Sequence, residues 1–157
     1  MSGEPMRRTT SGRALRLVGA ETQVEAPADH ASLTLPPERQ SVAIGRHWVV
    51  RIAAAAGVTG MANQVVELLT SELLSNAVLH GAGGRPVHVW FWAGEDEVVR
   101  VSVSDSVPAR PVVLHPDVVA PSGRGMAIVE AMSNRWGVDA LADGGKTVWF
   151  EIDLDQY

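Results

Sequence analysis

Residues 71–80 read SELLSNAVLH and close a helical pattern that runs from about position 61 to position 80. Apolar side chains recur three and four positions apart in this pattern, so they form one continuous stripe along the helix. The main row of the stripe consists of Val65, Leu69, Leu73 and Ala77. A glycine-rich run at 81–84 ends the pattern. We therefore expect an amphipathic helix that covers a hydrophobic core with one face.

Two polar residues of this helix, Glu72 and Asn76, lie at the border of the apolar stripe. They are four positions apart, so their side chains stack one turn above the other. A carboxylate and an amide oxygen in this arrangement can converge on a hydrated Mg²⁺ ion and on the phosphates that it carries, because hard cations take oxygen ligands. An ordinary amphipathic helix with polar residues at its border explains the same pattern, and the spacing alone does not decide between the two.

The elements around this helix follow the order strand, helix, helix, hairpin, helix, hairpin. Alternating apolar and polar residues predict the strands, and the three-to-four spacing predicts the helices. The expected strands are 32–35, 87–92, 99–104, 136–141 and 147–154, and the expected helices are 38–56, 61–80 and 123–135. This order predicts an α+β fold, a two-layer sandwich with a mixed, mostly antiparallel sheet and three helices on one face.

The composition limits the classes of function. The chain has 157 residues, of which 46% are hydrophobic and 20% charged, which suits one soluble globular domain. Its formal net charge of −5 is a poor match for a phosphate backbone, so we expect no direct nucleic-acid partner. The absence of cysteine excludes disulfides, thiolate catalysis and cysteine zinc sites. No apolar run reaches the roughly 18 residues that cross a bilayer, so we expect a cytoplasmic protein with no membrane partner.

Residues 1–30 are expected to be a flexible tail, and residues 31–157 the single domain.

One acidic residue is expected to point into the core. Asp105 continues the alternation of Val99, Val101 and Val103, so its carboxylate emerges on the apolar face at the end of a strand. A charge at such a place needs a partner. An exocyclic amine such as that of adenine is one candidate, and a structural hydrogen bond to a loop amide is the other.

A glycine-containing turn precedes the third helix. Ser122-Gly123-Arg124-Gly125 leads into an apolar helix that begins with Met126. Glycines let backbone amides approach a ligand closely, and a helix N-terminus favours anions such as phosphate. A Ser-capped helix after a flexible loop is the alternative.

The residues Gly145-Lys146-Thr147 match the end of a P-loop motif. The residues that follow alternate as a strand, however, whereas a P-loop requires a helix there.

The order of these motifs resembles that of the ATPase superfamily of gyrase, histidine kinases and mismatch-repair proteins. The motifs are SELLSNAVLH, Asp105, the 122–126 turn and Lys146-Thr147. Within it, the chain over about 33–154 is most similar to the small single-domain anti-sigma-factor serine kinases of bacteria. The resemblance implies the histidine-kinase-like ATPase fold, with ATP and Mg²⁺ held between the helices and a mobile lid at about 107–121.

Site roles also come from this resemblance. Asn76 would ligate magnesium, and Asp105 would hold the adenine amine with help from Thr147 through water. Glu72 would be the general base that accepts the proton of a serine hydroxyl. The triphosphate would be lined by the remaining motif residues, Ser122, Gly123, Arg124, Gly125 and Met126.

The implied function is an ATP-dependent protein serine/threonine kinase that phosphorylates an anti-anti-sigma factor and so controls the availability of a sigma factor. The alternative is a catalytically weak or inert ATP-binding protein that acts by sequestering a partner. The chain departs from the family pattern at Val107 and Ala109, which replace the glycines of the Asp-x-Gly-x-Gly box, and this restricts the hinge of the lid. Related kinases suggest a homodimer, for which Trp90 and Trp92 could supply the contact, although packing within the sheet explains them equally well.

Overall fold

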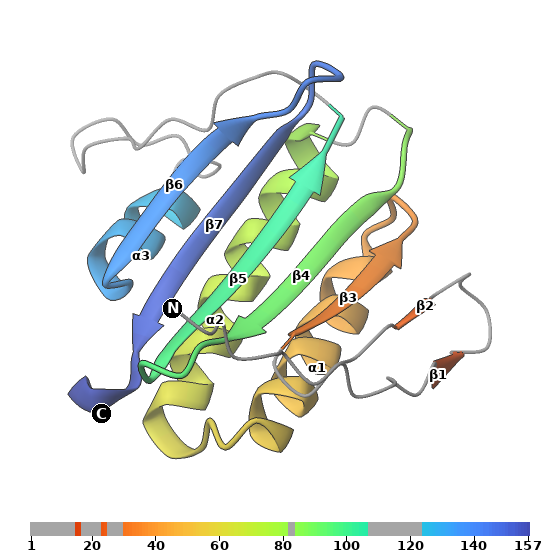
Figure 1. The fold of residues 1–157 in the computed structure, drawn as a ribbon. Helices are drawn as coiled ribbons and strands as arrows, with labels where there is room; N and C mark the ends of the chain where they lie inside the picture. The colour runs from red at the N-terminus through yellow and green to blue at the C-terminus, as the bar shows by residue number, and fades with distance from the viewer. Residues whose placement is uncertain (1–14, 17–22, 25–29, 82–83, 107–123) are drawn as a thin grey trace, which may run out of the picture.

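The computed structural model describes residues 15–16, 23–24, 30–81, 84–106 and 124–157. Five strands form one antiparallel sheet in the order β3-β4-β5-β7-β6 (Figure 1). The strands are β3 (His30–Leu35), β4 (Val87–Ala93), β5 (Val98–Asp105), β6 (Arg135–Ala140) and β7 (Lys146–Asp153). Every pairing in this sheet is antiparallel, so the mostly antiparallel sheet expected from the sequence is confirmed.

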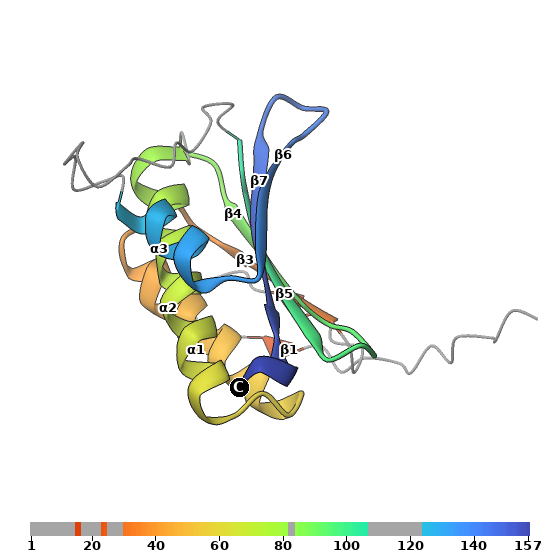
Figure 2. The ribbon, with the colours of Figure 1, turned by 90° about the vertical axis from the view of Figure 1, so that its left-hand side faces the viewer.

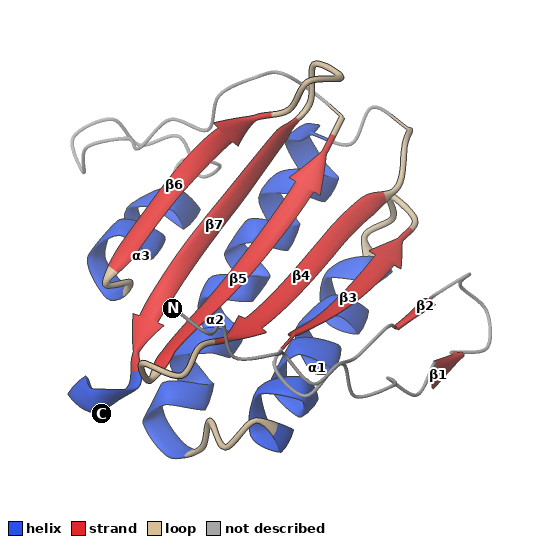
Figure 3. Cartoon of the chain, viewed as in Figure 1, coloured by secondary structure: helices blue, strands red, loops and turns tan. Residues whose placement is uncertain are grey.

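Three α-helices cover one face of the sheet, and the described residues place no helix on the other face (Figures 2 and 3). They are α1 (Gln40–Ala55), α2 (Gly60–Asn76) and α3 (Arg124–Met132). A short 3₁₀ turn, Leu154–Gln156, follows the last strand. The two-layer α+β architecture predicted from the element order is therefore present. No helix in the described part of the chain combines the length and the apolar character that a membrane crossing requires.

The core lies between the two layers and follows the alternation along each strand. In β4, Val87, Val89 and Phe91 are buried, whereas Trp90 and Trp92 between them are exposed on the open face. Helix α2 supplies the opposite wall through Leu69 and Leu73 and their neighbours. Apolar residues recur at every second position in the strands and at every third or fourth position in the helix. The apolar face of the sheet and the apolar face of α2 therefore pack against each other.

Helix α1 packs closely on α2 at a glycine. A Cβ atom at Gly45 would lie 2.6 Å from Cδ1 of Leu74 and 2.9 Å from Cδ1 of Leu35, which is closer than real Cβ atoms approach their neighbours. Glycine at this position therefore lets α1 contact both α2 and β3. This packing fixes the position of α2, and with it the polar residues Glu72 and Asn76, relative to the sheet.

The end of α2 differs from the sequence-based expectation. We expected an α-helix as far as position 80, but α2 ends at Asn76 and continues as a π-helical turn, Ala77–Gly81. Ala77, the first residue of this wider turn, stays buried in the core. Such π turns are common at functional sites.

The expected flexible tail at residues 1–30 falls largely outside the described residues. Within it, β1 (Leu15–Arg16) pairs antiparallel with β2 (Gln23–Val24) in a separate two-stranded sheet. The expected lid at 107–121 also lies outside the described residues.

Candidate functional site

The sequence-predicted polar residues gather at one end of the helical layer. Strand β5 ends there at Asp105, and β7 begins there at Lys146. The π-helical turn after α2 contacts β5, and α3 packs beside α2 (Figures 1 and 2). The site is thus formed by α2 with its π turn, by the beginning of α3, and by the paired ends of two central strands.

Glu72 and Gly125 are in direct contact between α2 and α3. A Cβ atom added at Gly125 would collide with Oε2 of Glu72 and would lie 3.4 Å from its Cδ atom. Only glycine, therefore, lets the first turn of α3 rest on the Glu72 carboxyl group in its present position. Two motifs that are more than fifty positions apart in the sequence are brought together here, as the sequence-based hypothesis requires.

The environment of Glu72 changes its acidity. The side chain is half-buried at the α2–α3 contact, and this burial raises the pKa of Glu72 above its ordinary value because it removes water from around the charged form. A carboxylate with a raised pKa is a better proton acceptor at neutral pH than an ordinary one. The geometry therefore suits Glu72 for general-base chemistry.

Asn76 is the last residue of α2, one turn beyond Glu72, and its side chain is half-buried. Within the part of the chain that the structure describes, its amide group makes no hydrogen bond to protein. Its carbonyl oxygen is a hard donor of the type that Mg²⁺ prefers. One neutral oxygen and a nearby carboxylate fit a Mg²⁺ ion that takes most of its other ligands from water and phosphate.

Asp105 faces inward, as its position in the strand predicts, and only 4% of its surface is exposed. One partner of this carboxylate is a lysine that was not among the candidates named from the sequence. The Nζ atom of Lys146, directly across the strand pair, lies 2.9 Å from Oδ2 and 3.1 Å from Oδ1 of Asp105. A cross-strand ion pair thus gives the buried carboxylate a counter-charge.

The structure does not bring Thr147 to Asp105. Thr147 pairs with Ser104 in the strand register, and their hydroxyl oxygens are 2.7 Å apart. Because successive residues of a strand point to opposite faces, Thr147 and Ser104 lie on the open face of the sheet, away from Asp105. Lys146 is the residue of β7 that shares the Asp105 face, and the role expected for Thr147 through water stays a prediction.

Lys146 is also the functional candidate that the sequence analysis missed. In the sequence analysis, Lys146 appears only as part of the Lys146-Thr147 motif and has no role in the site. The signal was nevertheless present, because Lys146 has the same parity as Val148 and Phe150, both of which are buried. Gly145 reinforces the placement, since a Cβ atom there would collide with the carbonyl oxygen of Asp105.

The turn before α3 is described only in part. Ser122 and Gly123 lie outside the described residues, whereas Arg124 is the first residue of α3. Met126 is 3% exposed and belongs to the hydrophobic core, so its side chain anchors α3. A contact between Met126 and a phosphate would therefore use its backbone.

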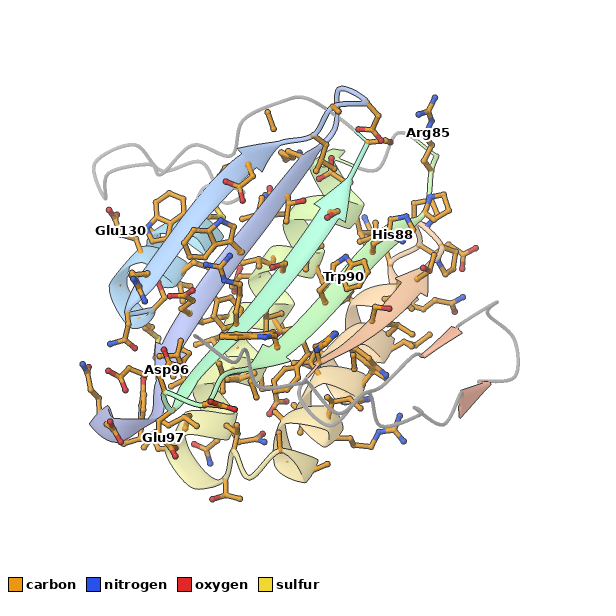
Figure 4. The ribbon with its side chains drawn as sticks, in the orientation of Figure 1. Arg85, His88, Trp90, Asp96, Glu97 and Glu130 are labelled. Atoms are coloured by element: carbon orange, nitrogen blue, oxygen red, sulfur yellow. The ribbon has the colours of Figure 1, made fainter. Side chains whose placement is uncertain are left out.

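The open face of the sheet is chemically separate from this site. His88 and Trp90 stand on β4 on that face (Figure 4), and the Nδ1 atom of His88 is 2.9 Å from the hydroxyl oxygen of Thr34 on β3. On β7, the ring of Trp149 stacks under Arg100, whose guanidinium carbon lies 4.0 Å from the ring centroid. Trp90 and Trp92 are 49% and 42% exposed on this face.

Comparison with known proteins agrees with the motif order. A family model for the histidine kinase-like ATPase domain matches residues 35–152, which is most of the chain. No curated protein matches the chain. A solved histidine kinase domain from the blue-light activated histidine kinase of Erythrobacter litoralis EL346 is 22% identical, with a TM-score of 0.49, and the alignment covers 71% of this chain and 61% of that one.

A second solved structure, of the Erythrobacter litoralis EL346 blue-light activated histidine kinase, is 15% identical with a TM-score of 0.38. The alignment covers 87% of this chain and 75% of that one. The chain spans less than two thirds of the first of these structures.

Proposed function

Because the chain belongs to the histidine kinase-like ATPase family, we propose that it binds ATP with Mg²⁺ at this site and transfers the γ-phosphoryl group to a serine or threonine of a protein substrate. The observation that carries the proposal is the contact between Glu72 and Gly125. It places a carboxylate of raised pKa against the first turn of a helix, where phosphate is favoured.

The nucleotide would extend across three elements. Asp105 would accept a hydrogen bond from the exocyclic amine of adenine, and the amides at the start of α3, with Gly123, Arg124 and Gly125, would face the triphosphate. Asn76 would contribute its carbonyl oxygen to Mg²⁺, which when bound would neutralise phosphate charge.

Glu72 would act on the substrate hydroxyl. Its carboxylate would take the proton as the hydroxyl oxygen forms a bond to the γ-phosphorus, while the bond from that phosphorus to the bridging oxygen breaks and ADP leaves. Most of the rate enhancement in such reactions comes from positioning and from electrostatic stabilisation, so Glu72 contributes as much by orienting the hydroxyl as by its basicity.

The substrate we propose is an anti-anti-sigma factor, and the second partner a sigma factor, with the kinase acting in the cytoplasm. Phosphorylation of the first protein would leave this chain available to bind the second. The exposed pair Trp90 and Trp92 is the surface through which we propose that two copies would pair.

A second function, sequestration of a partner without phosphoryl transfer, is favoured by one observation. The acceptor atoms of Asp105 are already engaged by Lys146 in a buried ion pair. A nucleotide that had to displace Lys146 from this carboxylate would bind more weakly than at a site where the acid is unengaged.

Incubation with radiolabelled ATP, Mg²⁺ and purified candidate anti-anti-sigma factors separates the two functions. We expect labelled phosphoserine or phosphothreonine with the wild-type protein and a loss of about 100-fold or more in rate with Glu72→Gln. Partner binding of undiminished affinity without any transfer would reject the kinase and support sequestration. The Glu72→Gln protein should still bind the partner, which is the control that its partner-binding surface is intact.

A further inference from the structure

Lys146 is the only lysine in the sequence, and it is buried on the helix-facing side of the sheet. A buried ammonium group is costly unless it is paired. Here one Nζ atom contacts both oxygens of Asp105, and the two side chains are 6% and 1% exposed. The cation therefore belongs to the same small region of the site as the carboxylate that we assign to the nucleobase.

The position of the pair is fixed by the backbone. Asp105 and Lys146 are the last residues paired between β5 and β7. The absence of a side chain at Gly145 lets the chain pass directly over the carbonyl oxygen of Asp105. The ammonium group therefore sits at a defined place at the end of the sheet, next to the strand that the π turn contacts.

We propose that Lys146 is a specificity-determining residue of the nucleotide site, whose ammonium group stays beside Asp105 in the complex and donates a hydrogen bond to the ring nitrogen N1 of adenine. This inference rests on the proposed ATP site. Asp105 would accept from the exocyclic amine and Lys146 would donate to N1, so the pair would match the adjacent donor and acceptor on that edge of the base.

When adenine binds, each hydrogen bond that Lys146 and Asp105 give up is replaced by a hydrogen bond to the base. The longer contact of Lys146, at 3.1 Å to Oδ1, is replaced by a bond from the ammonium to N1. The adenine amine then donates to Oδ1, while the contact of Lys146 with Oδ2, at 2.9 Å, is retained. An ionised carboxylate has about four acceptor sites, so it can accept from the amine and from the ammonium together.

Complete displacement of Lys146 by the base is the competing arrangement. It would replace a charge-assisted bond between two ions by a bond between an ion and a neutral amine, and it would separate the buried cation from the carboxylate. Retention avoids this cost. It also gives the base two contacts where Asp105 alone offers one.

The test compares ATP with 1-deaza-ATP, which keeps the amine but has a C–H group in place of N1. 7-deaza-ATP is the matched control, because its altered atom lies on a different edge of the base. With wild-type protein and Mg²⁺, we expect 1-deaza-ATP to bind about tenfold or more weakly than ATP, as for the loss of a hydrogen bond from a charged donor, and 7-deaza-ATP to bind like ATP. In Lys146→Met the ratio of ATP to 1-deaza-ATP affinities should fall to about one, and Lys146→Arg should restore part of it.

A second measurement needs no substitution. Because there is one lysine, protein labelled with ¹⁵N-lysine gives a single ammonium signal in NMR spectra. We expect this signal to shift on addition of ATP and to stay protected from solvent exchange, and to shift differently with 1-deaza-ATP. A signal that becomes exchange-broadened with ATP would show that Lys146 is expelled and would overturn the inference.

The outcomes also separate this inference from the proposed function. Tight binding of ATP and 1-deaza-ATP with equal affinity removes Lys146 from recognition but leaves the ATP site intact. Failure of wild-type protein to bind any of the three nucleotides rejects both. A preference for ATP over 1-deaza-ATP that persists in a folded Lys146→Met protein contradicts the inference alone.

Discussion

At the scale of single residues, the site depends on groups whose surroundings give them unusual properties. Glu72 is kept partly from water by the start of α3, and the buried Asp105 carboxylate is paired with a buried lysine. The inward orientation of Asp105 could be predicted from strand parity. Its partner could not, because it depends on the register between strands that are some forty residues apart in the sequence.

The raised pKa of Glu72 has a consequence for stability. Between the ordinary value, 4.5, and the raised one, the folded chain holds this proton more tightly than the unfolded chain, so the contribution of Glu72 to the free energy of unfolding falls as pH rises through that window. Glu72→Gln removes the effect. We therefore expect its Tm relative to wild type to increase as the pH rises above 4.5 and to level off once the pH exceeds the raised pKa of Glu72.

Thermal unfolding of both proteins across that pH range measures this difference directly. Asp96→Asn, in the exposed turn between β4 and β5, is the control for a carboxylate outside the site. A Tm difference that shrinks with rising pH, or that does not vary with it, would contradict the assigned environment of Glu72.

At the scale of elements, the sequence predicts which segments are helices and strands but not where they touch. The alternation in 87–92 and 99–104 identified a hairpin, and the apolar stripe identified α2. The close approach of α3 to α2 at Gly125 could not be read in the same way, because a glycine before a helix is equally typical of a flexible turn. The π turn after Asn76 was missed because its residues continue the helical apolar pattern.

The α2–α3 contact predicts the effect of Gly125→Ala. The added methyl group meets the end of the flexible Glu72 side chain, so the helices can stay in place while the carboxylate moves. We expect the free energy of unfolding to change by less than about 1 kcal/mol, because alanine also favours the helix. Phosphoryl transfer should fall about 10- to 100-fold through the misplaced base.

A double-mutant cycle tests whether Gly125 acts through Glu72. On the Glu72→Gln background, Gly125→Ala should cause little further loss of transfer, since the two substitutions affect the same group. Independent and multiplicative losses would show that Gly125 has a separate role, such as contact with phosphate.

At the scale of the whole molecule, an α+β sandwich holds a polar site at one end of its helical layer while the rest of the interface is apolar. Composition and element order were sufficient to predict this architecture, because each element has one clearly apolar face. Trp90 and Trp92 lie half-exposed on the opposite face of the sheet. The surface that we propose for pairing of two copies is therefore separate from the end that we propose for ATP.

The central claim, that this end of the sandwich binds ATP with Mg²⁺, is tested most directly by a calorimetric titration of the wild-type chain with ATP, with and without Mg²⁺, beside Asn76→Ala. We expect saturable binding that Mg²⁺ strengthens by about tenfold or more, and a loss of that strengthening in Asn76→Ala with an unchanged Tm. No binding of ATP at millimolar concentration, or binding of equal strength with and without Mg²⁺ in both proteins, would contradict the account.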